Sequence, residues 1–149
     1  MKLSIVIPVY NEEKTIKKCI DGVNKVKLGA KIKKEIIVVN DGSTDKTLSI
    51  ISRFASSTDI QQSLIKVSYK ENRGKGFAIR QGLKKATGDY IIIQDADLEY
   101  DPKDYQKLLN PILDKKAQVV YGSRFLGPHK NLFFLNMLAN KFLSFLTNL

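Results

Sequence analysis

The sequence predicts an α/β fold, a mostly parallel Rossmann-like sheet with helices on both faces. Short runs rich in isoleucine and valine alternate along the chain with longer amphipathic stretches. Strands buried on both faces of a parallel sheet have this nearly continuous apolar character, and their alternation with helices is typical of doubly wound sheets. The 149 residues suit one domain, since domains run to roughly 100–200 residues. An apolar share of 43% and a charged share of 27% exclude a disordered chain.

Five apolar runs are expected to form the strands of this sheet. Each run is short, and the polar residues that follow it mark the end of the strand. The runs are Leu3–Val9, Glu35–Asn40, Leu64–Tyr69, Tyr90–Gln94 and Gln118–Tyr121.

Capping residues and a proline mark where the intervening helices should begin. Side chains of Asn, Ser and Thr cap helix starts, and proline suits the first helical turn. These signals are Asn11 before Glu12 and Glu13, Ser43 or Thr44 before Asp45, and Pro102 before a helix running to about Asp114.

The segment from Leu132 to Leu149 predicts one further, amphipathic helix. Apolar residues recur there at spacings of three and four, with polar residues on the opposite side. The segment is too short and too polar for a membrane span, which needs about 20 mostly apolar residues. It is expected either to pack on the domain or on sequence beyond it, or to lie at a membrane interface.

The chain is strongly basic, with 25 Lys and Arg against 15 Asp and Glu and a net charge of +10. The excess is concentrated in residues 14–34 and 66–85 and predicts an anionic partner: a phosphate-rich substrate, a lipid surface or a nucleic acid. A single cysteine, Cys19, excludes a disulfide framework, and a single histidine, His129, excludes an HExxH metal site. The start of the chain lacks a signal peptide, so we expect a location on the cytosolic side.

Polar clusters follow every one of the expected strands. In open α/β sheets, ligands bind beyond the carboxyl ends of the strands. We therefore expect these clusters to converge on one cleft. They lie at residues 8–13, 40–45, 72–76, 95–99 and 122–124.

The strongest single signal is Asp95-Ala96-Asp97, directly after an apolar strand. Residues 89–101 carry five acidic side chains and no basic one, although the chain as a whole is basic. Carboxylates this close favour a bound cation, and oxygen ligands suit Mg²⁺ or Mn²⁺ with a phosphate completing the shell. The alternative is a solvated acidic turn that caps the helix at Pro102.

Three weaker signals also point to a phosphate-bearing ligand. The glycine-containing basic loop 72–76 opens a helix and could approach phosphate closely, or it could be an ordinary turn. Asp41 could contact a nucleotide base or ribose, or belong to a turn and cap. Arg124 could clamp a phosphate with its forked donors, or be a surface arginine.

Taken together and in this order, these motifs resemble family 2 glycosyltransferases, which have the GT-A fold. The resemblance covers nearly all of residues 3–127. Residues 95–100 and 120–125 are closer still to the branch that transfers mannose or another hexose to dolichol or polyprenyl phosphate. Asn40 stands where members often carry a second acidic residue.

The resemblance implies a role for particular residues. Asp95, Asp97 and Glu99 would hold the metal, Mg²⁺ or Mn²⁺, while Asp97 and Arg124 would be catalytic and Arg124 would contact the acceptor phosphate. The nucleotide-diphosphate sugar, of GDP-mannose or UDP-glucose type, would be bound by Pro8, Tyr10, Glu12, Val39, Asp41, Gly74, Lys75, Asp95, Ala96 and Asp97.

The implied reaction is a metal-dependent, inverting transfer of a hexose to a polyprenyl or dolichyl phosphate. The acceptor phosphate is already ionised at neutral pH, so no strong general base is needed. Residues 1–127 would form the glycosyltransferase domain, and residues 128–149 a helix at the acceptor or membrane interface. We expect a peripheral protein at the anionic, cytosolic face of a membrane, and a chain that is a C-terminally truncated member of the family.

Three alternatives remain open. A family 2 enzyme with a glycan hydroxyl as acceptor would need a carboxylate base from sequence beyond Leu149. An inactive fragment would bind nucleotide sugar or membrane without turnover. A nucleic-acid-binding protein ranks last, because no nucleic-acid motif is present and aromatic residues are not interleaved with the basic runs.

Overall fold

The computed structural model describes residues 1–29, 32–56 and 64–122. The chain divides into two compact units, Met1–Lys107 and Leu108–Leu149. The first unit contains all the strands of the described part and the polar clusters that follow them.

The first unit is built on a parallel four-stranded sheet in the order β3-β2-β1-β4. The two central strands are almost completely buried, as their apolar sequences predict. The parallel sheet and its first four strands are therefore confirmed, with small shifts of their ends. The strands are β1 (Lys2–Val9), β2 (Lys33–Asp41), β3 (Leu64–Tyr69) and β4 (Tyr90–Ile93).

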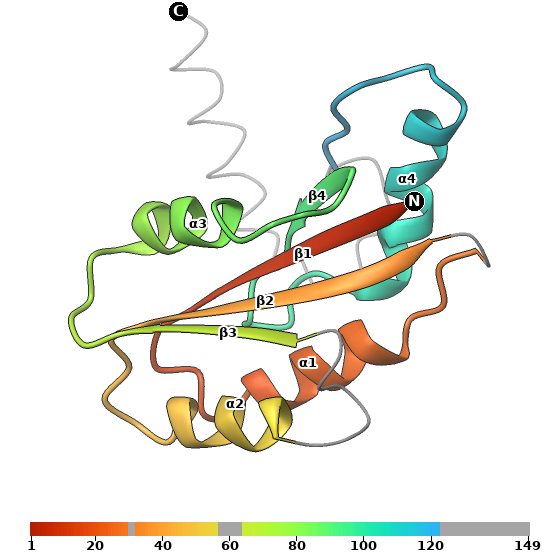
Figure 1. Ribbon diagram of the computed structural model, residues 1–149. Coiled ribbons are helices and arrows are strands. Elements are labelled where there is room, and N and C mark those ends of the chain that lie inside the picture. The colour runs from red at the N-terminus through yellow and green to blue at the C-terminus, as the bar shows by residue number, and fades with distance from the viewer. Residues whose placement is uncertain (30–31, 57–63, 123–149) are drawn as a thin grey trace, which may run out of the picture. The chain divides into compact units, whose positions relative to one another are not determined.

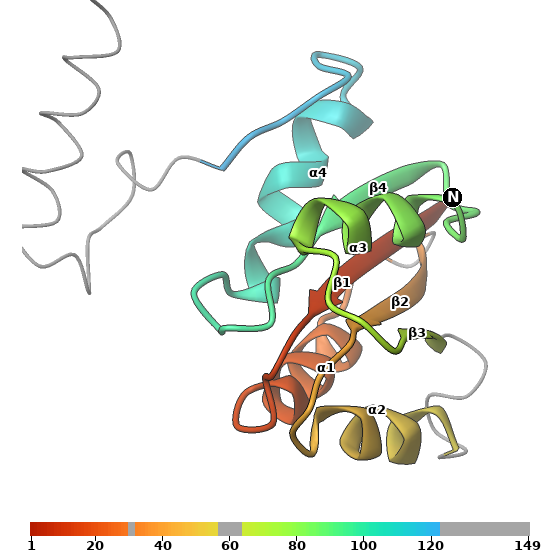
Figure 2. The same cartoon turned by 90° about the vertical axis from the view of Figure 1, so that its left-hand side faces the viewer.

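Helices cover both faces of this sheet, which confirms the predicted α/β layering. Helix α3 lies on one face against β1 and β2, and α1 and α2 lie on the other (Figures 1 and 2). The helical elements are α1 (Ile16–Lys25), α2 (Thr47–Ala55), α3 (Lys75–Leu83), the 3₁₀ turn η1 (Pro102–Asp104) and α4 (Tyr105–Leu113). The helix expected from Pro102 to about Asp114 thus exists, with a 3₁₀ first turn.

The close contact between α3 and the sheet depends on a glycine. Val6, Val39 and Ala78 form a fully buried cluster between strand and helix. A Cβ on Gly82 would lie 2.3 Å from Val6 Cγ1 and 3.3 Å from Val39 Cγ2, far inside van der Waals contact. The absence of a side chain at this position therefore sets how near the helix approaches the strands.

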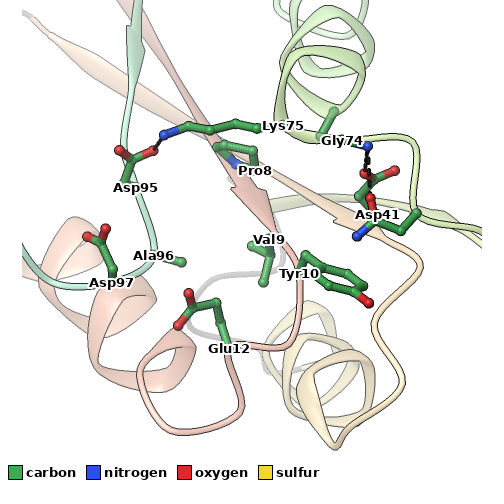
Figure 3. Close-up of a pocket in the computed structure, with 12 residues that line it drawn as sticks. Pro8, Val9, Tyr10, Glu12, Asp41, Gly74, Lys75, Asp95, Ala96 and Asp97 are labelled. Carbon is green, nitrogen blue, oxygen red and sulfur yellow. Dashed lines mark hydrogen bonds and ion pairs between the residues drawn. The ribbon is translucent and has the colours of Figure 1, made fainter.

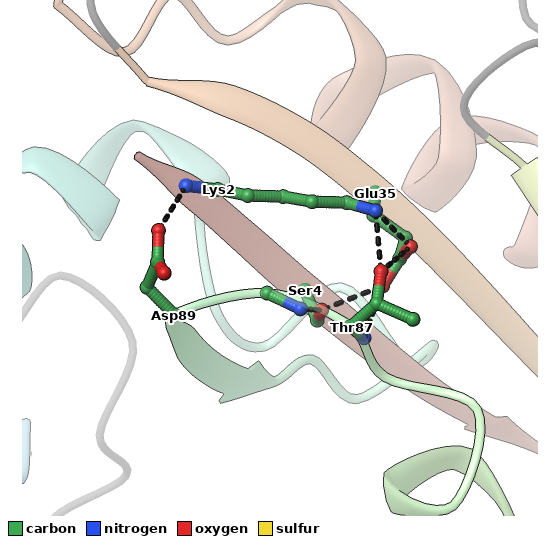
Figure 4. Close-up of polar contacts among 6 residues, drawn as sticks. Lys2, Ser4, Glu35, Thr87 and Asp89 are labelled. Carbon is green, nitrogen blue, oxygen red and sulfur yellow. Dashed lines mark hydrogen bonds and ion pairs between the residues drawn. The ribbon is translucent and has the colours of Figure 1, made fainter.

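A buried carboxylate joins the amino ends of the strands (Figure 4). Glu35 on β2 accepts hydrogen bonds from Ser4 Oγ on β1 at 2.7 Å and from Thr87 N and Oγ1 at 2.9 and 2.7 Å, and it pairs with Lys2. Burial disfavours its charged form, but hydrogen bonds from Lys2, Ser4 and Thr87 outweigh this and lower the pKa of Glu35 to about 2. The network lies at the sheet end opposite the polar clusters.

Two predicted helix caps are wrong, because the residues join loops to one another instead. Asn11 adopts φ 54°, and its Oδ1 accepts from Thr44 N at 2.8 Å, while α1 begins only at Ile16. Ser43 Oγ accepts from Asn11 N at 3.0 Å.

Helix α2 begins at Thr47, three residues later than a Ser43 cap implies and two later than a Thr44 cap implies. Asp45 Oδ1 accepts from Thr47 N at 2.9 Å at the start of the helix. The capping partner is therefore the aspartate of the predicted first turn rather than the hydroxyl residue before it.

The fifth predicted strand is wrong. Residues 118–121 form no strand in the described part of the chain, and Val119 and Tyr121 are 67% and 90% exposed. In the second unit, α4 ends at a turn in which Lys115 has φ 58°. The amphipathic helix predicted over 132–149 lies outside the described residues. None of the helices in the described ranges combines the length and apolar composition that a membrane span requires.

Candidate functional site

The carboxyl ends of the parallel strands and the start of α3 enclose an open pocket of about 270 Å³. Figure 3 shows its side chains arriving from different strand ends. Four of the five predicted polar clusters therefore meet at this edge of the sheet, as expected for parallel strands. Of the fifth cluster, Gly122 does not line the pocket, and residues 123–124 lie outside the described residues. The pocket is lined by Pro8, Val9, Tyr10, Glu12, Asp41, Asn72, Gly74, Lys75, Ala78, Asp95, Ala96 and Asp97.

One wall is built where β2 meets the loop before α3. Gly42 follows β2 with φ +75°, a conformation that favours glycine. A Cβ there would lie 2.5 Å from both Asn72 N and the carbonyl carbon of Glu71. Only a glycine allows this approach, which brings the loop within reach of Asp41.

Asp41 is buried at this wall, and only one of its two carboxylate oxygens accepts hydrogen bonds from the described residues. Its Oδ2 accepts from Arg73 N at 3.0 Å and from Gly74 N at 2.7 Å. Its Oδ1 is buried and has no hydrogen-bond partner among the described residues, and the residue is 2% exposed. A buried carboxylate oxygen left unpaired is costly, so an oxygen lining a pocket is suited to accept an N–H or O–H from a ligand.

The opposite wall carries Asp95 and Asp97 (Figure 3). Lys75 reaches from the first turn of α3 to Asp95, with Nζ 2.6 Å from Oδ1. Asp97 Oδ1 accepts from Glu99 N at 3.0 Å, which fixes the side chain on its turn. The pocket therefore has a lysine and a helix N-terminus, both attractive to anions, beside two carboxylates that favour cations.

The donor set suits a divalent cation shared with an anionic ligand. Within the described ranges, no three His, Cys, Asp or Glu side chains are grouped so as to hold a metal by themselves. Asp95 and Asp97 both line the pocket, and hard cations such as Mg²⁺ are commonly held by one or two carboxylates with phosphate oxygens supplying other ligands. These two aspartates fit such a group; Glu99 is exposed and does not line the pocket.

The loop after β1 supplies the floor and is hydrogen-bonded to the first residue of α2 and to the loop after β2. Glu12 N donates to Thr47 Oγ1 at 2.8 Å, and the Asn11–Thr44 contact lies beside it. Tyr10 remains 46% exposed and lines the same pocket as Asp41 (Figure 3). A planar base could stack on the tyrosine ring.

Cys19 of α1 lies behind the acidic wall. Its Sγ is 3.7 Å from the Asp95 carbonyl oxygen, to which it donates. Burial, together with the negative charges of Asp97, Glu12 and Asp95, raises the pKa of Cys19 to about 12. The thiol is therefore neutral, in keeping with a packing role.

The structure brings together all but one of the residues predicted for the nucleotide sugar. The exception is Val39, which is fully buried against α3. Asn40 is buried too, and its Nδ2 donates to Ser68 Oγ at 3.0 Å, which links β2 to β3. Arg124 lies outside the described residues.

The pocket also includes Val9, Asn72 and Ala78, which were not among the residues predicted to bind the nucleotide sugar, although Val9 and Asn72 lie in the predicted clusters 8–13 and 72–76. Asn72 belongs to the predicted phosphate-binding loop 72–76, so its place two residues before Gly74 could have indicated that it lines the pocket. Ala78 is a small apolar residue that nothing in the local sequence distinguishes from a core position.

Comparison with known proteins places this geometry in a family. The sequence model of glycosyl transferase family 2 matches residues 4–147. An uncharacterized protein of Methanocaldococcus jannaschii is 36% identical over 97% of this chain and 60% of its own length. A UDP-N-acetylglucosamine–dolichyl-phosphate N-acetylglucosaminyltransferase of Methanococcus voltae is 31% identical over 96% of this chain and 61% of its own length. The chain thus spans about three fifths of these relatives.

Solved structures support the same relationship. A mannosyltransferase from Pyrobaculum calidifontis, in complex with GDP-Man and Mn²⁺, superposes with a TM-score of 0.58 at 33% identity, covering 68% of this chain and 29% of that one. Glucosyl-3-phosphoglycerate synthase from Mycobacterium tuberculosis, in complex with Mn²⁺, UDP and glucosyl-3-phosphoglycerate, superposes with a TM-score of 0.58 at 30% identity, covering 75% of this chain and 39% of that one.

Proposed function

This chain belongs to glycosyl transferase family 2, and on that premise we propose that it transfers a hexose from a nucleotide-diphosphate sugar to a polyprenyl or dolichyl phosphate. The observation that carries the proposal is the pocket itself. A buried carboxylate oxygen without a partner lies at one wall, and a lysine and two aspartates lie at the other.

The first wall suits the nucleoside. Asp41 Oδ1 would accept from a base N–H or a ribose hydroxyl, and the exposed ring of Tyr10 lines the same pocket. Uracil and guanine both present a ring N–H, whereas the corresponding ring nitrogen of cytosine is an acceptor. Where the contact is to the base ring, a donor sugar on UDP or GDP is favoured over one on CDP, whereas a contact to the ribose hydroxyl would not distinguish them.

The second wall suits the diphosphate. The Lys75 ammonium and the N-terminus of α3 would attract phosphate oxygens. Asp95 and Asp97 would hold Mg²⁺ or Mn²⁺, which supplies neutralisation of the charge that develops on the departing diphosphate. The relatives solved with Mn²⁺ and nucleotide support this assignment.

Chemically, an acceptor phosphate oxygen would form a bond to the sugar's anomeric carbon as the bond to the diphosphate breaks. The electron pair of that bond leaves with the nucleoside diphosphate, and the anomeric configuration inverts. The attacking oxygen is already ionised, so no side chain has to remove a proton. Arg124 as the contact for the acceptor phosphate stays a prediction from the resemblance.

The acceptor class is supported by the Methanococcus voltae relative, which is named for transfer to dolichyl phosphate. A second candidate, a glycan hydroxyl, is favoured by the poly-beta-1,6-N-acetyl-D-glucosamine synthase of Staphylococcus aureus, 36% identical over 81% of this chain and 28% of its own length. A hydroxyl acceptor would need a general base that a phosphate does not.

We also propose that the protein is peripheral at an anionic cytosolic membrane face, where such an acceptor resides. The basic stretch through α1 supports this, because Lys14 and Lys18 are exposed and each basic residue near an anionic surface contributes about 1 kcal/mol. Co-sedimentation with vesicles containing 30% phosphatidylglycerol should exceed that with phosphatidylcholine alone and should fall as salt rises. Equal binding to both would remove the electrostatic part of the proposal.

The transfer assay uses radiolabelled UDP-GlcNAc, UDP-glucose and GDP-mannose with Mg²⁺ or Mn²⁺. Each donor is paired with a short polyprenyl phosphate or with an oligosaccharide. Product should form on the polyprenyl phosphate, and Asp97→Asn should lower turnover at least 100-fold. Asp104→Asn, at an exposed aspartate outside the pocket, is the matched control and should leave turnover unchanged. If product formed only on the oligosaccharide, a glycan hydroxyl would replace polyprenyl phosphate as the proposed acceptor. Full activity of Asp97→Asn would refute the proposal that the Asp95–Asp97 wall binds the metal and the diphosphate.

A further inference from the structure

A buried glutamine, which was not among the predicted site residues, holds the turn that carries Asp95 and Asp97 by hydrogen bonds. Gln94 directly precedes Asp95 and is 2% exposed. Its backbone N–H donates to the Val6 carbonyl at 2.9 Å, so it is held by β1 at the end of β4.

The side-chain amide of Gln94 closes the turn. Its Nε2 donates to the Asp95 carbonyl at 2.9 Å and to the Tyr100 carbonyl at 3.1 Å, so one group binds both ends of residues 95–100. Its Oε1 accepts from Tyr105 Oη at 2.7 Å, and Tyr105 is itself 2% exposed. The hydroxyl therefore fixes which way the amide faces, and the amide fixes the turn.

The turn has reason to need external support. It holds Asp95, Asp97 and Glu99 within five residues, and like charges at such spacing repel one another. Leu98 adopts φ 68°, a left-handed conformation that is unfavourable for a residue with a side chain. Strained backbone of this kind persists where surrounding structure over-determines it.

We propose that Gln94 and Tyr105 are positioning residues for the diphosphate end of the pocket. They hold the 95–100 turn in the conformation in which both aspartate carboxylates face the ligand. Neither residue lines the pocket, so their effect passes through Asp95 and Asp97. The identity of the ligand rests on the proposed function, whereas the fastening of the turn does not.

The test compares nucleotide binding with and without Mn²⁺. Tyr105→Phe removes one hydroxyl and keeps the ring, so it deletes only the hydrogen bond to Gln94. Gln94→Leu removes the amide itself and with it the hydrogen bonds to Asp95, Tyr100 and Tyr105. Tyr90→Phe is the matched control, because the Tyr90 hydroxyl has no hydrogen bond within the described ranges. Calorimetric titrations with UDP and GDP give the gain in affinity that Mn²⁺ confers. Tyr105→Phe should reduce this gain at least fivefold, while the Kd without Mn²⁺ stays within twofold of wild type.

A purely structural role would weaken binding equally with and without Mn²⁺, and that result, or no change at all, would overturn the proposal. Hydrogen exchange of the ligand-free protein gives a second reading. Amides of residues 95–100 should exchange at least tenfold faster in Tyr105→Phe than in Tyr90→Phe, and this increase should exceed any in β1. If wild-type protein binds neither nucleotide, the proposed function fails, and exchange alone decides the positioning role: unchanged protection of the turn would refute it.

Discussion

Replacing Glu35 by glutamine should destabilise the protein strongly and in a pH-dependent way. The buried carboxylate accepts hydrogen bonds from Ser4 and Thr87 and pairs with Lys2, which together lower its pKa from 4.5 to about 2. A tenfold change in an ionisation constant corresponds to about 1.4 kcal/mol, so the charged form contributes about 3 kcal/mol to the free energy of unfolding. Glutamine has the shape of the carboxyl group but never carries its charge.

The lowered pKa of Glu35 determines how the stability of the protein changes with pH. An acid that is stronger in the folded state stabilises the protein above its unfolded pKa, and this contribution is lost as pH falls through the folded value. The free energy of unfolding of wild type should therefore exceed that of Glu35→Gln by about 3 kcal/mol at pH 7. This difference should shrink as the pH falls from 4.5 to about 2. Urea unfolding at a series of pH values measures it. Glu71→Gln, at an exposed glutamate, is the control.

A difference between wild type and Glu35→Gln that stays constant from pH 7 to pH 3 would refute this reasoning. It would mean that the network contributes through shape and hydrogen-bond count, with no contribution from the charge of the carboxylate. A difference equal to that of Glu71→Gln would show that the network contributes nothing specific.

Three further outcomes follow from particular contacts. Gly82→Ala should lower the free energy of unfolding by about 1–3 kcal/mol through overpacking, whereas Gly76→Ala, with only a flexible side chain nearby, should be neutral or stabilising in urea unfolding. Lys34→Met should cost about 1–3 kcal/mol because three carbonyl groups at the end of α1 lose their donor, while Lys33→Met should not. Lys75→Met removes the cation paired with the acidic wall, so Mn²⁺ binding without nucleotide, followed by electron paramagnetic resonance, should tighten at least twofold; unchanged affinity would show that lysine and metal do not compete.

The buried strands could be predicted from the sequence because their composition leaves few alternatives. Runs such as Ile36 to Val39 are apolar at every position, which suits only an element covered on both faces. Residues 118–121 share this character only in Val119 and Val120, which lie between Gln118 and Tyr121, and no strand forms there. Strand formation depends on a partner as well as on propensity, and a short local pattern contains no information about the partner.

The pocket was predictable for a related reason: parallel strands bring their carboxyl ends to one edge, so the residues that follow them must meet. What the sequence could not reveal were contacts between distant residues. Asn11 is a plausible cap until Thr44 is brought next to it. Gln94 reads as the polar end of a strand until Tyr105 and Tyr100 are placed around its amide.

The most direct test of the account is the titration of UDP and GDP, with Mn²⁺, into wild-type protein and Asp41→Asn. The asparagine oxygen can keep the bonds from Arg73 N and Gly74 N, which turns its amide N–H₂ toward the position of the unpaired Oδ1. The acceptor for the nucleoside is then replaced by a donor. Hydrogen bonds to charged groups contribute about 1.5–3 kcal/mol, so affinity for UDP or GDP should fall at least tenfold while CDP is less affected and urea unfolding is little changed. Equal affinity of both proteins for every nucleotide would contradict the claim that this pocket is the nucleotide-sugar site.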